Sequence, residues 1–231
     1  MAIYIIADLH LSFGCEKPMD VFGGNWVGYT DKIESNWRNK ILEDDSVIIP
    51  GDISWAMYLN ESIKDFEFIN SLPGTKYILK GNHDYWWETK SKLDAFFKEK
   101  GFGTINVLYN NSYIIDDYAI CGTRGWKEPE GDSTSEEDVK IYNREVIRLK
   151  LALDSIKDDN KKRIVVLHYP PFNSKNETGK IAELMKEYNV KKCYYGHIHG
   201  EKCKYIFEGE KDGIEYKLVS GDHLGFDPII I

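Results

Sequence analysis

Residues 46–52 have the sequence Ser-Val-Ile-Ile-Pro-Gly-Asp, and this segment indicates the fold class of the protein. Val47, Ile48 and Ile49 form a continuous apolar run, which is typical of a strand whose two faces are both covered. Residues 163–168 repeat the pattern, with four apolar residues in a row before His168. Because strands of this kind occur mainly in α/β proteins, the two runs predict that fold class.

Other apolar patterns flank these two strands. The further segments that we expect to form strands are residues 2–7, 76–80, 105–109, 112–116, 118–122, 192–196, 203–208 and 214–220. Apolar residues at helical spacing predict helices near residues 33–41, 63–72, 93–97, 139–156 and 181–188, and Thr134 with Glu137 forms a capping box before the fourth. Asp212-Gly213 predicts a hairpin turn within residues 203–220. Since strands and helices alternate over the first hundred residues, we expect one α/β domain over residues 1–231, with two sheets stacked between helices.

The composition excludes several classes of protein. The chain has 231 residues, of which 42% are hydrophobic and 29% charged, a balance that argues against disorder or a fibrous repeat. A formal charge of −8 disfavours a nucleic-acid partner. No run approaches the roughly 18 apolar residues of a membrane span, and the apolar start ends at Asp8 without a basic flank, so we expect no membrane partner and no signal peptide. Four scattered cysteines without a CxxC pair indicate reduced thiols and a cytoplasmic protein.

Histidines mark the ends of the predicted strands. Five of the six follow a strand directly, and these are His10, His83, His168, His197 and His199. In open α/β sheets, ligands bind beyond the carboxyl ends of the strands. A single histidine there would ordinarily be a satisfied polar residue. Five of them, each beside an aspartate, asparagine, glycine or proline, indicate a shared site instead.

Two motifs place ligand-type side chains two residues apart. An extended backbone would point the Asp8 carboxylate and the His10 imidazole to the same side, where they could hold one ion together. His197 and His199 would do the same with two imidazoles, and the glycines on either side of this pair leave room for close backbone approach. The Asp-x-His motif alone is also compatible with a chance arrangement on the surface.

Three further segments have both a chemical and a purely structural interpretation. Asp52 could bridge two cations through its two oxygens, or it could cap the following helix. Asn82 could supply an oxygen ligand, while His83 could meet a substrate oxygen with Asp84 fixing its tautomer. An Asx turn is the alternative for that segment. His168 could be a metal ligand or a core histidine.

In chain order the motifs are Asp-x-His, Gly-Asp, Gly-Asn-His-Asp, His and Gly-His-x-His, and this series resembles the calcineurin-like metallophosphoesterase superfamily. The resemblance runs from Asp8 to His199. It implies a four-layer α/β/β/α sandwich with two mixed sheets, and a site for two divalent metal ions at the strand ends. The implied ligands are Asp8, His10 and His199 for the first ion, Asn82, His168 and His197 for the second, and Asp52 as the bridge. Nitrogen and oxygen ligands without cysteine suit manganese, iron or zinc.

The resemblance also implies an activity, that of a metal-dependent phosphohydrolase in which a metal-bound hydroxide attacks phosphorus in line with the leaving group. Protonated His83, with Asp84 behind it, would stabilise or protonate that group. The chain has Gly-Asn-His-Asp where protein serine/threonine phosphatases carry Gly-Asn-His-Glu, so it is more similar to small bacterial phosphodiesterase-type members. We therefore expect a small phosphorylated substrate, either a phosphodiester or a small phosphomonoester. A non-catalytic scaffold on the same fold and a nuclease are the alternatives.

Residues that would contact the substrate are less clearly marked. Trp55, Trp86 and Trp126 could stack on a base or aryl group, and Arg124 could clamp a phosphate oxygen. Packing of the tryptophans over the core and a surface ion pair of Arg124 are the alternatives. Residues 11–29 form a long glycine-rich segment, which is compatible with a lid or with a passive loop. We expect His223 to be a surface histidine.

Overall fold

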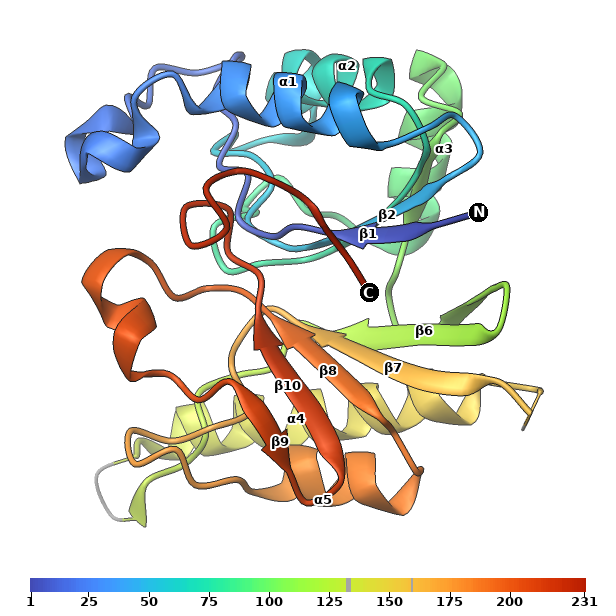
Figure 1. Ribbon diagram of the computed structural model, residues 1–231, viewed down its shortest axis with the longest axis vertical. Coiled ribbons are helices and arrows are strands. Elements are labelled where there is room, and N and C mark those ends of the chain that lie inside the picture. Colours follow the sequence, from blue (N-terminus) through green and yellow to red (C-terminus); the bar gives the residue numbers. More distant parts are fainter. Residues whose placement is uncertain (132–133, 159) are drawn as a thin grey trace.

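Two β-sheets lie face to face in the middle of the molecule, with helices on the outer face of each (Figure 1). The computed structural model describes residues 1–131, 134–158 and 160–231. The strand order is β11-β1-β2-β3-β4 in the first sheet and β5-β6-β7-β8-β10-β9 in the second. Each sheet combines parallel strands with an antiparallel strand at an edge. This architecture confirms the predicted α/β/β/α sandwich with two mixed sheets.

The first sheet comes mostly from the N-terminal part of the chain. Its strands are β1 (Ile3–Ile5), β2 (Ser46–Pro50), β3 (Thr75–Leu79), β4 (Ile105–Val107) and β11 (Ile229–Ile230). The helices on its outer face are α1 (Tyr29–Lys40), α2 (Ile63–Ser71) and α3 (Lys90–Lys100). All five residues of β2 are buried, as its continuous apolar run predicts.

The second sheet comes from the C-terminal part. Its strands are β5 (Ser112–Ile115), β6 (Tyr118–Thr123), β7 (Lys162–Leu167), β8 (Lys192–Tyr195), β9 (Gly209–Lys211) and β10 (Ile214–Leu218). The helices on its outer face are α4 (Glu136–Asp154) and α5 (Lys180–Glu187). Among the described residues, none of the helices is both long enough and apolar enough to cross a bilayer.

Three apolar cores hold the layers together. Ile5 and Ile48 of the first sheet share one core with Val166 of the second, between the two sheets. Trp37 and Leu149 belong to the two outer cores, where each sheet packs against its helices. Full burial of such a side chain contributes about 1.5–3 kcal/mol. The packing fixes the carboxyl ends of the central strands of both sheets at one edge of the molecule, on the left in Figure 1.

The segment after β8 differs from its prediction. A short apolar run predicts a strand over residues 203–208, but the chain forms a 3-10 turn over Gly200–Tyr205. The run is misleading because Tyr205 is exposed, while the Cys203 thiol donates back to the Ile198 carbonyl oxygen at 3.3 Å. The hairpin turn between β9 and β10 lies where it is predicted, and only the first of its two strands is displaced along the chain.

The cap of α4 lies one residue later than predicted. The Ser135 hydroxyl accepts from the Asp138 N–H at 3.1 Å and donates to the Asp138 carboxylate at 2.7 Å. The Thr134 hydroxyl instead accepts from the Glu130 N–H at 2.7 Å. The pattern of a hydroxyl and a carboxylate three residues apart is therefore present, with a shorter acidic side chain than expected.

Candidate metal centre

Backbone hydrogen bonds join the segments that leave the central strands. The His10 N–H donates to the Asp52 carbonyl oxygen at 2.9 Å, which ties the loop after β1 to the loop after β2. Ala7 forms a parallel bridge with Ser220, and its carbonyl oxygen accepts from the Gly221 N–H at 2.9 Å. Because these contacts run between the two sheets as well as within the first, side chains from both sheets meet at this edge.

Two groups of potential metal ligands lie at the meeting point. Within each group, one ligand atom from every residue lies within 4.8 Å of the others. The first group is Asp8, His10 and His199, and the second is Asp52, His168 and His197. The Nε2 atoms of His10 and His199 are 3.4 Å apart, and Asn82 Oδ1 lies 2.7 Å from His168 Nε2. The structure thus brings together all seven residues that the sequence analysis assigns to metals: the first group is the predicted set, and in the second the predicted bridge Asp52 joins His168 and His197, with Asn82 beside His168.

Asp52 lies between the two groups. Its Oδ2 atom is 3.7 Å from His10 Nε2 and 3.5 Å from His168 Nε2. Its other oxygen, Oδ1, accepts a hydrogen bond of 2.8 Å from the His83 backbone N–H, which fixes the carboxylate plane. A carboxylate in this position is suited to contact two cations at once.

The chemistry of these side chains fits a pair of divalent cations. Asp8 Oδ1 and Asp52 Oδ2 are buried and have no hydrogen-bond partner among the described residues. Burial raises the pKa of Asp8 to about 7 and that of Asp52 to about 6. Burial also lowers the pKa of His168 to about 3, which keeps its ring neutral and able to coordinate. Since unpaired buried carboxylates are costly, cations held by them and by neutral imidazoles would relieve an unfavourable arrangement.

The ring of His168 has a defined tautomer. Its Nδ1 atom lies 3.0 Å from the Pro50 carbonyl oxygen, which can only accept, so Nδ1 carries the proton. The lone pair of Nε2 then faces Asp52 and Asn82. A backbone carbonyl behind a histidine is the usual way in which a metal-binding imidazole is oriented.

His199 is oriented by a carboxylate that the sequence analysis does not include. Asp222 Oδ1 lies 2.8 Å from His199 Nδ1, and Asp222 Oδ2 accepts from the Gly200 N–H at 2.9 Å. Burial opposes protonation of His199, but the hydrogen bond to Asp222 and the charge of Asp8 outweigh it and raise the pKa of His199 to about 9. The signal for Asp222 is a Gly-Asp pair directly after the segment 214–220, the same pattern that marks Asp52. The adjacent His223 is exposed, as predicted.

The backbone at the centre is not extended as the two-residue spacing predicts. Asp8 and His10 have φ angles of 58° and 45°, and Asp52 and His197 have φ angles of 50° and 74°. For residues with a side chain this left-handed region costs of order 1–3 kcal/mol each. Four such residues in one cluster indicate that the surrounding packing imposes the conformation in which their side chains converge.

Asp84 does not contact the ring of His83. It is fully buried, and its carboxylate accepts from the backbone N–H groups of Ile53, Ser54 and Gly81 at 2.8, 3.2 and 2.7 Å. The Nδ1 atom of His83 is buried and unpartnered among the described residues. The prediction that Asp84 fixes the His83 tautomer is therefore wrong. The carboxylate instead joins the loops after β2 and β3, both of which carry predicted metal ligands.

His83 is half-buried and differs in charge from the prediction. Burial lowers its pKa from 6.5, and the negative charge of Asp52 only partly opposes this effect. The ring is therefore neutral near pH 7 and not protonated as expected. It packs 4.4 Å from the Trp55 ring and 5.7 Å from the ring of His10, measured between centroids. A neutral imidazole in this place can still donate one N–H to a substrate oxygen.

Two of the predicted stacking residues have other environments. Trp86 is only 1% exposed, and its indole N–H donates to Asp84 at 3.1 Å, so the prediction that it stacks on substrate is wrong. Trp126 donates to Asp138 at 2.8 Å, and its ring packs 5.0 Å from that of Tyr169. Hydrogen bonds to carboxylates fix both rings, and neither ring lines the cavity at the first group of ligands.

Arg124 lies beside the centre and is partly paired. Its guanidinium lies 3.8 Å from the Glu145 carboxylate and stacks on the Trp126 ring at 4.6 Å. Its carbonyl oxygen accepts from the His168 N–H at 3.1 Å, so the residue is fixed next to a predicted ligand through its backbone. Its Nε atom is buried without a hydrogen-bond partner among the described residues.

A cavity of about 790 Å³ opens at the first group of ligands. The rings of His10, His83 and His199 line it together with aromatic side chains that include Trp26 and Trp55. Trp55 stacks on His10, with the centroids 5.0 Å apart and an angle of 23° between the planes. Of the four predicted substrate residues, Trp55 is thus the one that faces this cavity.

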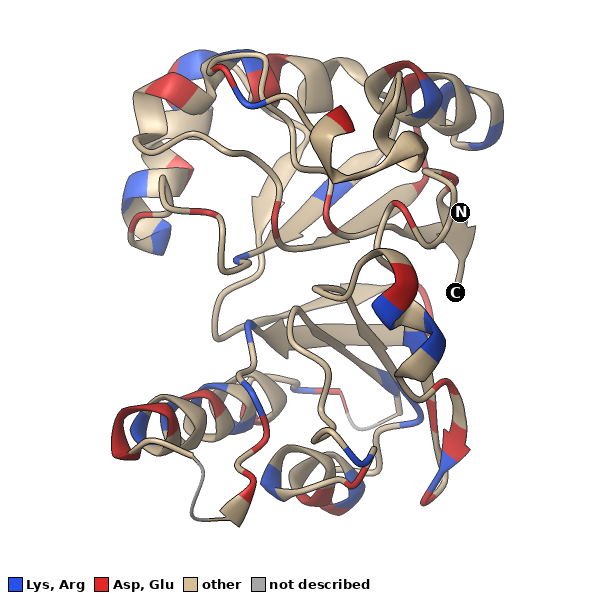
Figure 2. Ribbon diagram, turned by 90° about the vertical axis from the view of Figure 1, so that its left-hand side faces the viewer, with Lys and Arg blue, Asp and Glu red and all other residues tan. Residues whose placement is uncertain are grey.

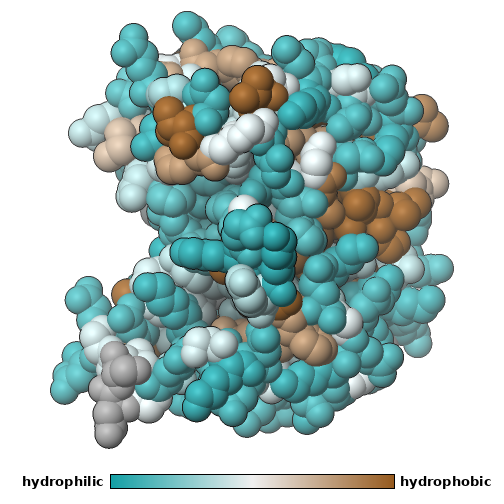
Figure 3. All heavy atoms as spheres, turned by 60° about the vertical axis from the view of Figure 1, so that its left-hand side comes forward, coloured by the Kyte–Doolittle hydropathy of each residue, from teal (hydrophilic) through white to brown (hydrophobic). Residues whose placement is uncertain are grey.

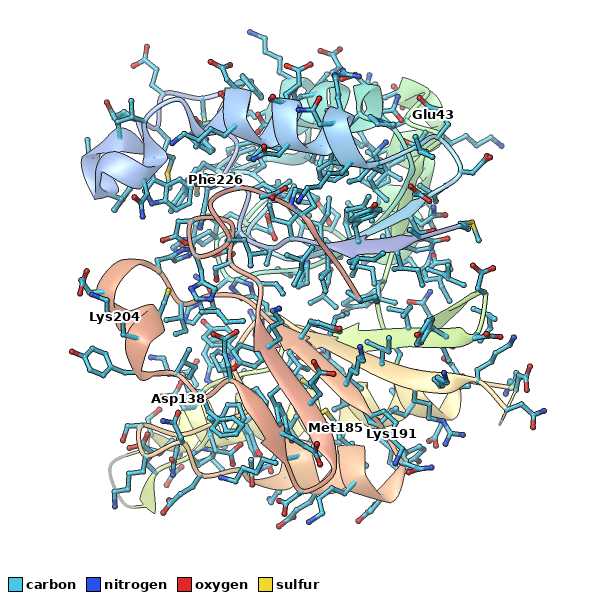
Figure 4. All side chains as sticks on the ribbon, viewed as in Figure 1. Glu43, Asp138, Met185, Lys191, Lys204 and Phe226 are labelled. Carbon is cyan, nitrogen blue, oxygen red and sulfur yellow. The ribbon has the colours of Figure 1, made fainter. Side chains whose placement is uncertain are left out.

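Residues 11–29 form one wall of the cavity. The segment contains two 3-10 turns, Asp20–Phe22 and Gly24–Trp26. Trp26 is buried, with its ring 5.6 Å from that of His10 and 5.0 Å from that of Phe226. Phe226, labelled in Figure 4, belongs to the segment that leads to the C-terminus. The indole N–H of Trp55 points to the Met19 sulfur at 3.0 Å. These contacts place the segment directly over the predicted ligands.

Comparisons with known proteins agree with this geometry. No curated protein matches the sequence. Three similar solved structures are phosphopantetheinyl hydrolase from Mycobacterium tuberculosis, a protein of unknown function from Aquifex aeolicus, and the protein TT1561 of Thermus thermophilus. Their sequence identities are 16%, 17% and 15%, and their TM-scores are 0.61, 0.53 and 0.53. The alignments cover 95%, 99% and 94% of this chain, and 88%, 95% and 88% of the other chains.

These structural similarities support the fold. A family profile also assigns the chain to a protein family. The profile of the calcineurin-like phosphoesterases matches residues 1–201, which include every predicted metal ligand. The match covers most of the 231 residues. The chain therefore belongs to the calcineurin-like phosphoesterase family.

Proposed function

We propose that the protein hydrolyses a small phosphate ester at a centre that holds two divalent cations. The observation that carries this proposal is the position of Asp52 between two groups of ligands, with its free oxygen 3.7 Å from His10 Nε2 and 3.5 Å from His168 Nε2. One carboxylate flanked in this way is the arrangement that a bridged pair of cations requires. Two such ions, when bound, polarise the phosphoryl oxygens and lower the pKa of a water molecule that can attack phosphorus.

The charge of the centre favours an anionic substrate once it is loaded. Asp8 and Asp52 bring two negative charges to the ligand set, and the imidazoles of His10, His168 and His197 are held neutral because burial lowers their pKa values. Two divalent cations therefore leave a positive centre within a chain of net charge −8. A phosphate ester would be attracted locally, whereas a long polyanion such as DNA would meet an acidic surface.

His83 is the residue best placed to assist the leaving group. Its Nδ1 is buried, which leaves Nε2 as the nitrogen able to meet a substrate oxygen. Stacking of Trp55 on His10 and packing against His83 hold both rings at the mouth of the cavity. A neutral His83 would donate its N–H to the ester oxygen as the phosphorus–oxygen bond breaks, a role that typically accelerates hydrolysis about 10²–10⁴-fold.

The cavity favours a leaving group with apolar or aromatic surface. Phe22, Trp26, Trp55 and Met57 contribute to its lining next to the three histidines. Such rings and chains would bury an organic group attached to the phosphate. The name of the structural neighbour from M. tuberculosis, phosphopantetheinyl hydrolase, is in keeping with hydrolysis of a small organic ester. We therefore favour a small phosphomonoester or phosphodiester over a protein or a nucleic acid.

The test is hydrolysis of an aryl phosphomonoester and an aryl phosphodiester by the full chain supplied with Mn²⁺. We expect turnover of at least one ester, abolished by a chelator, and a fall in kcat of about 10²–10⁴-fold in His83→Ala with an unchanged metal content. Inactivity of the wild-type protein on both esters while two metal ions are bound would contradict the proposal and favour a non-catalytic scaffold.

A further inference from the structure

A second cavity, of about 400 Å³, lies next to the metal centre and shares no lining residue with the first. It is formed by the ends of β3 and β6, the segment before α3, and one face of α4. The surface is hollowed between the two halves of the molecule on this side (Figure 3). The cavity has no role in the function proposed above.

The lining of this cavity carries an excess of positive charge. Lys80, Arg124, Arg144 and Arg148 contribute four cations, whereas Glu88 and Glu145 contribute two carboxylates, and this leaves two positive charges unbalanced. Figure 2 shows Lys and Arg segments, in blue, on both halves of the molecule. The local excess contrasts with the net charge of −8 of the whole chain.

The two carboxylates are already engaged. Glu145 is fully buried, accepts from the Thr123 hydroxyl, and lies 2.6 Å from Arg148 and 3.8 Å from Arg124. Glu88 pairs at 3.1 Å with Lys92, which is outside the lining. Neither carboxylate is therefore available to neutralise the remaining cations.

Three of the cations keep unused donors. Among the described residues, the side chains of Lys80 and Arg144 form no hydrogen bond or ion pair, although Lys80 is half-buried. Arg124 Nε is buried without an acceptor, although it could donate to one. A buried guanidinium N–H without an acceptor is costly, and an anion in the cavity would supply the missing partner.

The cavity is close to the reacting position. Lys80 precedes the predicted ligand Asn82 by two residues, a span of about 7 Å in an extended chain. Arg124 is bonded through its carbonyl oxygen to the N–H of His168, another predicted ligand, at 3.1 Å. The cavity therefore borders two of the segments that carry predicted metal ligands.

From this we infer that the cavity binds a second phosphoryl group of the substrate, so that the substrate class is small molecules with two phosphoryl groups on a short linker. The inference rests on the proposed function, because the first phosphoryl group is the one hydrolysed. A phosphoryl group, rather than a carboxylate, matches the excess of two positive charges with its own two negative charges. Guanidinium groups bind such oxygens in a bidentate manner.

The experiment compares kcat/KM for propane-1,3-diol bisphosphate and for propyl phosphate, with Mn²⁺ and release of inorganic phosphate as the readout. We expect the wild-type protein to prefer the bisphosphate about 10- to 100-fold, the size of one or two charge-assisted hydrogen bonds. In Arg144→Gln the preference should fall at least about fivefold, and in Lys80→Gln it should fall further. Arg144 is exposed at the rim of the cavity, so its replacement does not threaten folding.

The matched control is Lys140→Gln. This variant removes one positive charge from the same helix, but Lys140 pairs with Glu136 away from the cavity, so the preference should remain that of the wild type. If the wild-type protein is active but has equal kcat/KM on both substrates, the inference of a second phosphoryl site is wrong, whereas the proposed function is not contradicted. If kcat/KM is higher for the carboxylate analogue 4-phosphonooxybutanoate than for the bisphosphate, the assignment of the second group as a phosphoryl group is wrong. Inactivity on every ester would overturn the proposed function itself.

Discussion

Asp222 orients the predicted metal ligand His199 from the side away from the centre. Its carboxylate contacts His199 Nδ1 at 2.8 Å and also accepts from the Gly200 N–H, so it fixes both the ring and the backbone beside it. The Asn side chain of Asp222→Asn has the same size as that of Asp, but the His199 ring loses its negatively charged acceptor. We expect the apparent affinity for Mn²⁺ to fall about 10–100-fold, with activity recovered at high Mn²⁺ concentration.

Activity as a function of Mn²⁺ concentration is the measurement for this variant. His223→Gln is the matched control, because His223 is adjacent in sequence but exposed, and lies 3.3 Å from Glu208. An Asp222→Asn protein with the Mn²⁺ dependence of the wild type would show that this hydrogen bond does not support metal binding.

The same pair predicts how the stability of the metal-free protein depends on pH. The pKa of His199 is raised to about 9, above its ordinary value of 6.5, so the folded chain binds an extra proton between these values. The free energy of unfolding should therefore fall as pH rises from about 7.5 to 9, where the unfolded histidines have already lost their protons. The buried imidazoles with lowered pKa values, such as those of His10 and His168, add little slope in this window, because they are neutral in both the folded and the unfolded chain.

Urea unfolding at several pH values, with a chelator present, measures this slope. The decline should be shallower in Asp222→Asn, since removal of the carboxylate lowers the pKa of His199. The interpretation fails if the two proteins show the same slope, or if the wild-type protein gains stability between about pH 7.5 and 9.

At the scale of elements, the end of β8 approaches the end of β1 so closely that only glycine fits. A Cβ atom added at Gly196 would lie 2.8 Å from the Cβ of Ala7 and would also clash with the Asp8 carboxylate. We expect Gly196→Ala to lower the free energy of unfolding by about 1–3 kcal/mol and to reduce Mn²⁺ binding, because Asp8 must move.

Gly103→Ala is the control for this prediction, since nothing lies within 4 Å of the added Cβ. Unfolding in urea and the Mn²⁺ content report the two effects separately. A Gly196→Ala protein as stable and as well loaded with metal as Gly103→Ala would contradict the close approach of β1 and β8.

The elements also show what the sequence can and cannot predict. Continuous apolar runs identify β2 and β7 correctly, because burial on both faces leaves no polar position in the pattern. Residues 203–208 mislead because the exposed Tyr205 of a 3-10 turn is part of an apolar run that imitates a buried strand. The left-handed backbone of Asp8 and His10 is imposed by contacts between loops that are distant in sequence, so no local pattern contains it.

At the scale of the whole molecule, the convergence of the predicted ligands is predictable because each motif follows a strand, and the family order of these motifs is retained from Asp8 to His199. The partners behind the ligands are harder to predict. Asp84 bonds to backbone N–H groups of a neighbouring loop, and Asp222 reaches back from the end of β10, so each role depends on the assembled sheets. The burial of Trp86 in the core is also hard to predict, because it depends on tertiary packing that the position of the residue in the sequence does not reveal.

The two sheets together create a site that neither contains alone. Asp8 and Asp52 come from the first sheet, and His168 and His197 come from the second. The ligand set is therefore complete only in the folded sandwich, and metal binding should stabilise the assembled layers against unfolding.

Metal content together with ester hydrolysis, measured in the wild-type protein and in Asp52→Asn, tests the central claim most directly. After equilibrium dialysis against Mn²⁺, the wild-type chain should hold about two ions and hydrolyse an aryl phosphate ester. Asp52→Asn should lose at least one ion and at least about 100-fold in turnover, whereas the exposed neighbour variant Asp44→Asn should match the wild type in both. An Asp52→Asn protein with two ions and wild-type turnover would contradict the account.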